Sequence, residues 1–302
     1  MRYTYKGKDY PKEIKLNHPE INPILGTIQP PQDEFDHMMS LPAQTLRQDL
    51  ENILLREIGN MWGKNEKEVE EYYMPSKLLF SCILICLIRV AAVNTTLQVV
   101  LELLRQPSST IYTVLGDDFD NIQAVPVLYT LTKDHPSLLK SFLLEEGTSH
   151  LGKEIVSELL GRIGLFTDDK RVYKEFADTV LEVMDAYLKD YDNEQKICDK
   201  DVISYLVDAA SDAGLHDMWD TVVSLFNKGM VNENICGDID TVLLGIDQAS
   251  IQNEIETDTE KLMYGMPRDW DFFFPSDGSE SGASIMLEWA KQTGLGKDKS
   301  AK

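Results

Sequence analysis

Hydrophobic residues recur at helical spacing along most of this chain, and the clearest case is the segment 168–191. Its apolar residues are separated by three or four positions, with polar residues between them. These apolar residues are Tyr173, Phe176, Val180, Val183 and Tyr187. Because an α-helix has about 3.6 residues per turn, this spacing brings them onto one face. The segment is therefore predicted to form an amphipathic helix that buries that face.

The same periodicity predicts a succession of helices between residues 40 and 246, and no run of alternating residues there predicts a strand. The predicted segments are 40–62, 76–92, 95–106, 108–115, 118–132, 135–143, 148–164, 168–191, 200–213 and 216–230, with a short helix after Gly237.

Residues with known preferences for helix ends mark several boundaries. Asn94 and Asp134 are predicted N-caps, since their side chains accept hydrogen bonds from the free N–H groups of a first turn. Gly164 and Gly214 are predicted stops, because glycine adopts the left-handed conformation that often ends a helix. Pro126 is expected to bend the helix in which it lies.

Successive helices are joined by links of roughly 2 to 8 residues, a length that places neighbouring helices antiparallel. The pairs 150–163 with 169–190 and 200–213 with 216–229 have the form of stacked hairpins. Stacked pairs bury their apolar faces against one another, as in a helical solenoid. The predicted fold class is all-α, a degenerate helical-repeat (HEAT-like) α-solenoid of antiparallel helix pairs.

Composition divides the chain into three parts. Residues 1–40 hold five prolines and little periodicity, so they are predicted to form an irregular arm with a short hairpin around Lys6–Asp9. Residues 41–246 are expected to form the helical-repeat body. Residues 247–302 are an acidic C-terminal segment with an aromatic patch and a predicted short helix, GASIMLEWAKQTG.

The charge of the chain narrows the classes of partner. Its 302 residues include 29 basic and 51 acidic ones, for a net charge of −22. Residues 151–302 hold 15 basic and 31 acidic side chains, against 14 and 20 in residues 1–150. Such a field repels phosphate backbones and anionic lipid surfaces and attracts basic proteins and cations. A basic protein is therefore the expected partner, and neither nucleic acid nor a membrane is expected.

The most apolar run also argues against a membrane. LLFSCILICLIRVAAV, residues 78–93, is 16 residues long and carries Arg89, so it is predicted to be a buried helix and not a membrane span. The N-terminus lacks the apolar region of a secretory signal. Four cysteines lie scattered without a disulfide framework, which favours a reducing cytoplasm.

Two similar stretches place a glycine directly before aspartates. They are VLGDDFDN at 114–121 and ICGDIDTV at 235–242. Such a pair could bind cations, or it could end one helix and cap the next. A calcium loop needs a glutamate at its twelfth position, but counting from the first aspartate gives Leu128 and Ala249. We therefore interpret both stretches as helix punctuation.

The sequence lacks recognisable catalytic motifs. GSESG, residues 278–282, has Glu280 where a nucleophile elbow needs serine. No Walker loop, dinucleotide fingerprint or HExxH motif occurs. Cys82 and Cys86 lie four residues apart and could supply half a metal site, but their apolar neighbours favour core packing. No catalytic residue, metal site or cofactor is therefore predicted.

Part of the chain resembles a known family. The stretches LELLRQPSSTIYTVLGDDFDN and LVDAASDAGLHDMWDTVVSLFNKGMVNENICGDIDTV are similar to a bacterial family of uncharacterised HEAT-like proteins, domain of unknown function eleven eighty-six. The resemblance covers roughly residues 75–246 and implies an α-helical repeat body with no established activity. Some relatives end in a cysteine- and histidine-rich zinc motif. This chain has neither residue after Cys236, so that zinc site is not carried over.

Four junction aspartates in the more acidic half are candidates for partner binding: Asp168, Asp169, Asp199 and Asp201. In a stacked array, junctions on the same edge align. Carboxylates there are expected to form a negative ridge that attracts a basic protein. The alternative is that they are solvated caps that keep the protein soluble.

A second candidate is the aromatic patch of Trp270, Phe272, Phe273 and Phe274. These side chains are too apolar to stay freely solvated. They are expected either to dock onto the end of the helical array and cap it, or to anchor a partner.

The leading functional hypothesis is a non-enzymatic protein–protein interaction scaffold, since solenoids present long binding surfaces and no catalytic constellation is visible. Two alternatives stay open. One is a metal-dependent enzyme or cation-binding protein that uses the junction aspartates. The other is an acidic decoy that takes the place of nucleic acid on a nucleic-acid-binding protein.

Overall fold

The computed structural model describes residues 9–25, 32–73, 79–115, 124–191, 197 and 199–252. Every regular element within these residues is a helix, and none is a strand. The all-α class predicted from the periodicity is therefore confirmed. The aromatic patch, the GSESG segment and almost all of the predicted hairpin at Lys6–Asp9 lie outside the described residues.

The helices of the first half are α1 (Ile21–Leu25), α2 (Gln32–Ser40), α3 (Ala43–Met61), α4 (Glu66–Tyr73), α5 (Leu79–Val90), α6 (Thr96–Leu104), α7 (Ser108–Leu115) and α8 (Ala124–Thr132). Those of the second half are η4 (Pro136–Leu139), α9 (Lys140–Leu143), α10 (His150–Phe166), α11 (Lys170–Tyr191), α12 (Lys200–Asp212), η5 (His216–Met218), α13 (Trp219–Asn227), α14 (Glu233–Cys236) and α15 (Ile239–Gln252).

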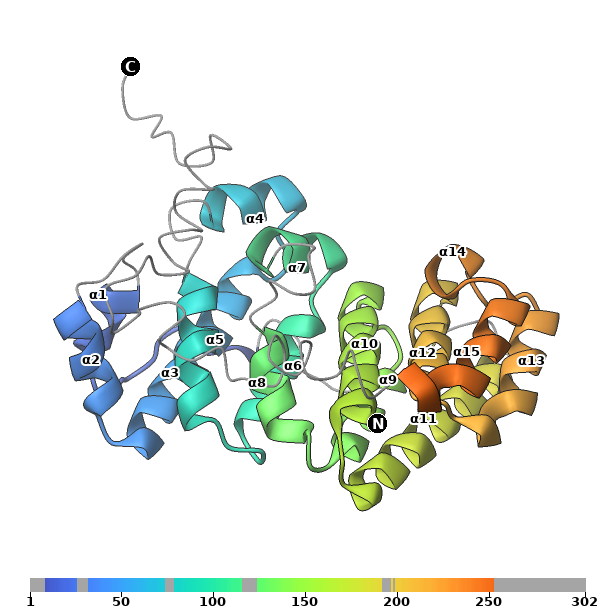
Figure 1. The fold of residues 1–302 in the computed structure, drawn as a ribbon. Helices are drawn as coiled ribbons and strands as arrows, with labels where there is room; N and C mark the ends of the chain where they lie inside the picture. Colours follow the sequence, from blue (N-terminus) through green and yellow to red (C-terminus); the bar gives the residue numbers. More distant parts are fainter. Residues whose placement is uncertain are drawn as a thin grey trace, which may run out of the picture.

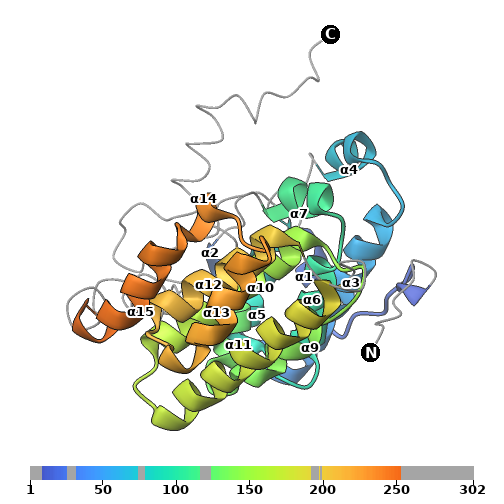
Figure 2. The same ribbon diagram turned by 90° about the vertical axis from the view of Figure 1, so that its right-hand side faces the viewer.

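The helices follow one another along the molecule, from α1–α3 at one end to α13–α15 at the other (Figure 1). In the C-terminal half, α12 packs between α10 and α15, while α11 and α13 lie against them as a second layer (Figure 2). Two glycines allow the helices of the first layer, α10, α12 and α15, to pack closely against one another. A Cβ atom at Gly161 of α10 would lie 2.7 Å from the Ala209 Cβ, and one at Gly245 of α15 would lie 2.1 Å from the Ser211 Oγ. Helices α10, α12 and α15 therefore pack side by side.

The segment predicted from its 3–4 spacing is confirmed as α11. Phe176, Val180, Val183 and Tyr187 are fully buried, and Tyr173 is half-buried. Tyr187 also donates its hydroxyl hydrogen to the Leu143 carbonyl oxygen at 2.9 Å, which satisfies the polar atom of a buried ring. Periodicity predicts this helix well because it packs against neighbours along its full length.

Helix α5 is the buried helix expected from the apolar run at 78–93. Phe80, Leu84, Cys86 and Leu87 have no exposed surface, and Arg89 is exposed. Core packing is thus confirmed for Cys86, while the Cys82 side chain lies outside the described residues. Within the part of the chain that the structure describes, no helix combines the length and hydrophobicity that crossing a membrane requires.

Of the helix predicted over residues 118–132, the structure describes Ala124–Thr132 as α8, so the predicted bend at Pro126 stays a prediction. The prediction that Gly164 ends a helix is wrong. Gly164 does not end α10, which continues to Phe166. A Cβ at Gly164 would lie 2.3 Å from the Phe176 ring, so this glycine lets α11 pack closely on α10.

Two predicted N-caps are also displaced by one residue. Thr95 and His135 occupy the N-cap positions of α6 and η4, in place of Asn94 and Asp134. Neither cap makes a side-chain hydrogen bond to its own helix. The Thr95 hydroxyl instead donates to Glu51 Oε1 at 2.9 Å, so a contact with another helix decides this end.

The prediction of an irregular N-terminal arm holds for residues 10–20, which form no helix or strand, but it is wrong for residues 21–25 and 32–40. Helices α1 and α2 lie within it, and Ile21, Ile24 and Leu25 of α1 are buried in the same core as the later helices. Prolines hide this order from a pattern search because they interrupt the periodicity on which such a search depends. At the other end, the helix after Gly237 is longer than predicted, since α15 reaches Gln252.

Candidate functional sites

The second glycine–aspartate motif is helix punctuation, as interpreted from the sequence. Gly237 follows α14 with a φ of 83° and donates its N–H to the Glu233 carbonyl oxygen. Asp238 then accepts the Thr241 N–H at 2.8 Å, at the start of α15. Hydrogen bonds from Thr241 lower the pKa of Asp238. The first motif, residues 114–121, lies mostly outside the described residues.

The four junction aspartates take part in local hydrogen bonds or ion pairs. Asp169 accepts the Arg171 N–H at 2.8 Å, and this bond is the main cause that lowers the pKa of Asp169. Asp199 caps α12 by accepting the N–H groups of Asp201 and Val202, each at 3.1 Å, and it pairs with His150. Asp201 accepts a hydrogen bond from the Asn232 side chain at 2.7 Å.

The structure brings Asp199 and Asp201 together but leaves Asp168 and Asp169 apart from them. The pair Asp199–His150 shows that α12 and α10 begin at the same edge. Asp168 and Asp169 precede α11, whose Tyr173 donates its hydroxyl hydrogen to Ala213 at the other end of α12, at 2.6 Å. The junction before α11 and the junction before α12 therefore lie at opposite ends of α12.

A larger acidic surface lies on the sides of α10 and α12. We call it the acidic face and define it by Glu154, Glu158, Asp201, Tyr205, Asp208 and Asp212. The four residues from α12 are spaced four, three and four positions apart, which places them along one side of the helix. All six side chains are half-buried or exposed. The sequence shows this spacing, but only the packing of α12 between α10 and α15 leaves that side open.

The carboxylates of the acidic face act on one another. Burial, followed by the charges of Asp199 and Asp201, raises the pKa of Glu154. Burial, followed by the charges of Glu154 and Glu158, raises the pKa of the Tyr205 hydroxyl. Arg162 offsets part of this charge by pairing with Glu158 at 3.5 Å. The face therefore carries a concentrated negative charge around a tyrosine ring.

Asp208 is expected to make the protein less stable as the pH rises through the mildly acidic range. Burial, and after it the charge of Asp212, raises the pKa of Asp208 to about 6, while Arg162 opposes the shift. The folded protein thus holds this proton more tightly than the unfolded chain, where aspartate titrates at about 4. The stabilisation that protonated Asp208 contributes is complete below about pH 4 and is lost as the pH rises through about 6.

Asp208→Asn removes this dependence because an amide does not ionise. We expect it to raise the free energy of unfolding by about 1–2 kcal/mol at pH 7.5, allowing for partial exposure, and to change it little at pH 4. Urea titrations at the two pH values measure the difference. Asp220→Asn, on the exposed side of α13, is the matched control. If Asp208→Asn raised the free energy of unfolding equally at both pH values, the ionisation of Asp208 would not be the cause of the gain.

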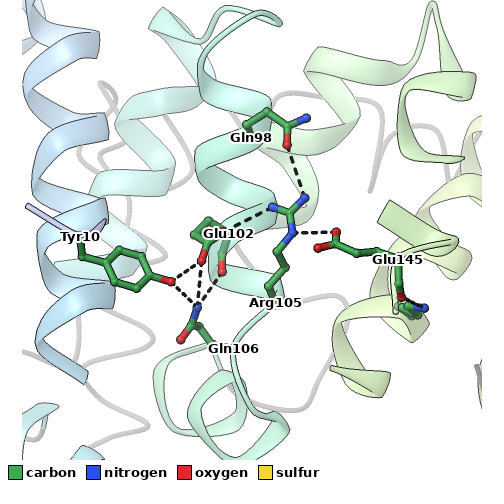
Figure 3. A network of polar contacts seen from close by, with 7 residues as sticks. Tyr10, Gln98, Glu102, Arg105, Gln106 and Glu145 are labelled. Atoms are coloured by element: carbon green, nitrogen blue, oxygen red, sulfur yellow. Dashed lines mark hydrogen bonds and ion pairs between the residues drawn. The ribbon is translucent and has the colours of Figure 1, made fainter. Parts of the chain in front are cut away.

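A second group of polar residues is buried, and Figure 3 shows it from close by. Glu102 and Gln106 are 1% and 2% exposed. The Tyr10 hydroxyl donates to Glu102 Oε1, and Gln106 Nε2 donates to the Tyr10 oxygen at 3.1 Å. Arg105 donates from Nε to Glu145 Oε2 at 2.9 Å, and its Nη1 lies 3.5 Å from Glu102 Oε2.

This buried network continues towards α12. Lys153 of α10 has no exposed surface, and its Nζ donates to the carbonyl oxygens of Glu145, at 2.6 Å, and of Ile197. The network joins the N-terminal segment, α6, the segment before α10 and the segment before α12. Sequence reasoning missed it, although Glu102 and Lys153 stand at inward positions of apolar helices, a pattern that signals buried charge.

The described residues contain no group of three or more histidine, cysteine, aspartate or glutamate side chains that could hold a metal ion. Comparison with protein-family models, with curated proteins and with solved structures found no match.

Proposed function

We propose that this protein is a non-enzymatic interaction scaffold, a degenerate HEAT-like array of antiparallel helix pairs that presents its acidic face to a basic protein. The observation that carries the proposal is the run of Asp201, Tyr205, Asp208 and Asp212 along the open side of α12, beside Glu154 and Glu158 of α10. The layered packing of α10, α12 and α15 supports the array.

Physical chemistry favours a basic partner for this face. A surface of one sign attracts the opposite sign from a distance and speeds association at low ionic strength. Tyr205 adds a ring face within the negative field, and Tyr112, which is 49% exposed on α7, lies close enough to act electrostatically on Tyr205. Tyrosine rings attract guanidinium groups, so an arginine-bearing surface fits better than a lysine-bearing one.

The two alternative functions use different atoms. A cation site at the junctions would share the carboxylates of Asp169, Asp199 and Asp238, which already accept backbone N–H groups. The decoy hypothesis uses the same acidic face as the scaffold. The decoy hypothesis requires that the partner bind the acidic face through the partner's own nucleic-acid-binding surface. Duplex DNA would then compete with the acidic face and displace this protein from the partner.

The scaffold proposal predicts a local effect of charge. We expect a triple variant to bind a labelled nine-arginine peptide about tenfold more weakly than the unaltered chain at 20 mM salt. The variant combines Glu154→Gln, Asp201→Asn and Asp212→Asn. Three lost attractions of roughly 0.5 kcal/mol each give about that factor. Fluorescence anisotropy measures the affinity, and a nine-lysine peptide tests the preference for arginine.

The matched control removes the same number of charges from the second layer, through Asp178→Asn, Glu182→Gln and Asp185→Asn on α11. We expect this variant to lose less than threefold, because Asp178 and Glu182 are already paired with Lys174 and Lys140 at 2.6 and 2.5 Å. The difference between the variants should vanish at 500 mM salt, where the Debye length falls to a few ångströms. Equal losses in both variants would show that net charge alone attracts the peptide.

A further inference from the structure

The N-terminal segment Tyr10–His18, here called the strap, lies along α3 and reaches α6. Tyr10 contacts Gly59 near the end of α3, whereas Asn17 and His18 bind Asp49 near its middle, so the strap runs antiparallel to the helix. The strap forms no helix or strand between its ends. It is an irregular peptide segment, with bends at residues 12, 13 and 17, held against a helical surface.

The first anchor is the Tyr10 side chain, which is only 4% exposed. A Cβ atom at Gly59 would lie 2.4 Å from the Tyr10 Cβ, so the groove has room for tyrosine only because residue 59 is glycine. The Trp62 ring closes one side, with its centroid 5.6 Å from that of Tyr10. The hydroxyl reaches Glu102 on α6 and Gln106 just after that helix, as Figure 3 shows for these two partners.

The second anchor is Asp49, which has no exposed surface. Its Oδ1 accepts the Asn17 backbone N–H at 2.8 Å and the Asn17 side-chain amide at 3.0 Å. Its Oδ2 accepts the His18 N–H at 2.8 Å. A buried carboxylate that receives two consecutive backbone N–H groups binds the main chain at a bend, whatever the side chains, because consecutive N–H groups of an extended chain point in opposite directions.

Between the anchors, side chains alternate in their exposure. Ile14 and Leu16 are half-buried and pack against the core, while Lys12 and Lys15 are exposed. A deep pocket for one ring, apolar side-chain contacts and a main-chain clamp are components with which proteins recognise peptides. These components are all present here, and they lie on α3 and α6, away from the acidic face.

We infer that the groove on α3 and α6 is a peptide-binding site that the strap occupies in cis. The ligand it takes in trans is a peptide with a tyrosine, two apolar residues and an asparagine at the spacing of Tyr10, Ile14, Leu16 and Asn17. A tethered strap has an effective concentration in the millimolar range, so it masks the site from free peptide. Weakening the anchors on the strap, while leaving the groove intact, unmasks it.

The experiment uses the full chain carrying Tyr10→Phe and Asn17→Ala, which removes the hydroxyl and the amide but keeps the ring on Gly59. The probe is a fluorescein-labelled peptide of residues 8–20, KDYPKEIKLNHPE. We expect this variant to bind the probe at least tenfold more tightly than the unaltered chain does, as measured by anisotropy. The inference is independent of the scaffold proposal, because the acidic face is unchanged in the variant.

Two controls test the specificity of this binding. A probe that itself carries Tyr10→Ala and Asn17→Ala should bind the variant at least tenfold more weakly than the parent probe. Adding Asp49→Asn to the variant should weaken the parent probe about as much. Equal binding of the probe to the unaltered and altered chains, or no binding to an altered chain that keeps its helical circular dichroism, would overturn the inference. If the double variant loses that signal, Asn17→Ala alone is used, and a gain below threefold overturns it.

Discussion

Replacing Arg105 with leucine is expected to lower the free energy of unfolding by about 3–5 kcal/mol. The guanidinium lies between the carboxylates of Glu102 and Glu145, which are 1% and 6% exposed. Leucine would keep much of the apolar stem but remove the positive charge that both buried carboxylates share. Urea unfolding at pH 7, followed by circular dichroism, measures the change.

The control for Arg105→Leu is Lys174→Leu. Lys174 is 73% exposed and pairs with Asp178 at 2.6 Å, so its ion pair is shorter but solvated. Exposed pairs of this kind contribute about 0.5 kcal/mol. We therefore expect the burial of the ion pair, and not the distance between its charged atoms, to decide which substitution lowers the free energy of unfolding more. Similar losses for the two variants would show that the buried network is compensated in some other way.

Gly152→Ala is expected to lower the free energy of unfolding by about 2–3 kcal/mol, although alanine favours a helix by roughly 1 kcal/mol. A Cβ atom at Gly152 would lie 2.0 Å from the Leu104 carbonyl oxygen and 2.9 Å from its carbonyl carbon. The clash is with backbone, so it is relieved only if the start of α10 moves away from the end of α6. The same denaturation assay measures the loss.

Gly229→Ala separates this clash from backbone strain. Gly229 has a φ of 66°, and no atom lies within 4 Å of the position that an alanine methyl group would take, so alanine there meets strain without a clash. That strain costs about 1 kcal/mol. A loss at Gly152 no larger than the loss at Gly229 would mean that the two helices can separate at little cost.

The two largest effects fall on the same contact region. Arg105 directly follows α6, and Gly152 lies where α10 starts against the end of that helix. Lys153, the next residue, extends the buried network towards α12. The region between the two halves of the molecule is thus held by a close backbone approach and by buried charge together.

The acidic face shows how far a sequence leads towards a site. The sequence shows the excess of acidic residues in the second half and identifies Asp199 and Asp201 as candidate binding residues. It does not show that Asp168 and Asp169 form a separate pair, which lies at the opposite edge from Asp199 and Asp201. Asp208 and Asp212 were missed because they stand within a helix, where a charged residue reads as ordinary solvent-facing surface.

The sequence by itself determined the helical class, the amphipathic face of α11, the burial of α5 and the punctuation at Gly237 and Asp238. Each depends on spacing or backbone preference within one segment, and such local signals survive in the order of residues. Only the tertiary structure decided that Gly164 is a packing residue, that Tyr10 belongs to the core and that Arg105 joins two carboxylates. These features depend on residues distant in the chain, whose approach is set by how whole helix faces pack, and no local pattern records it.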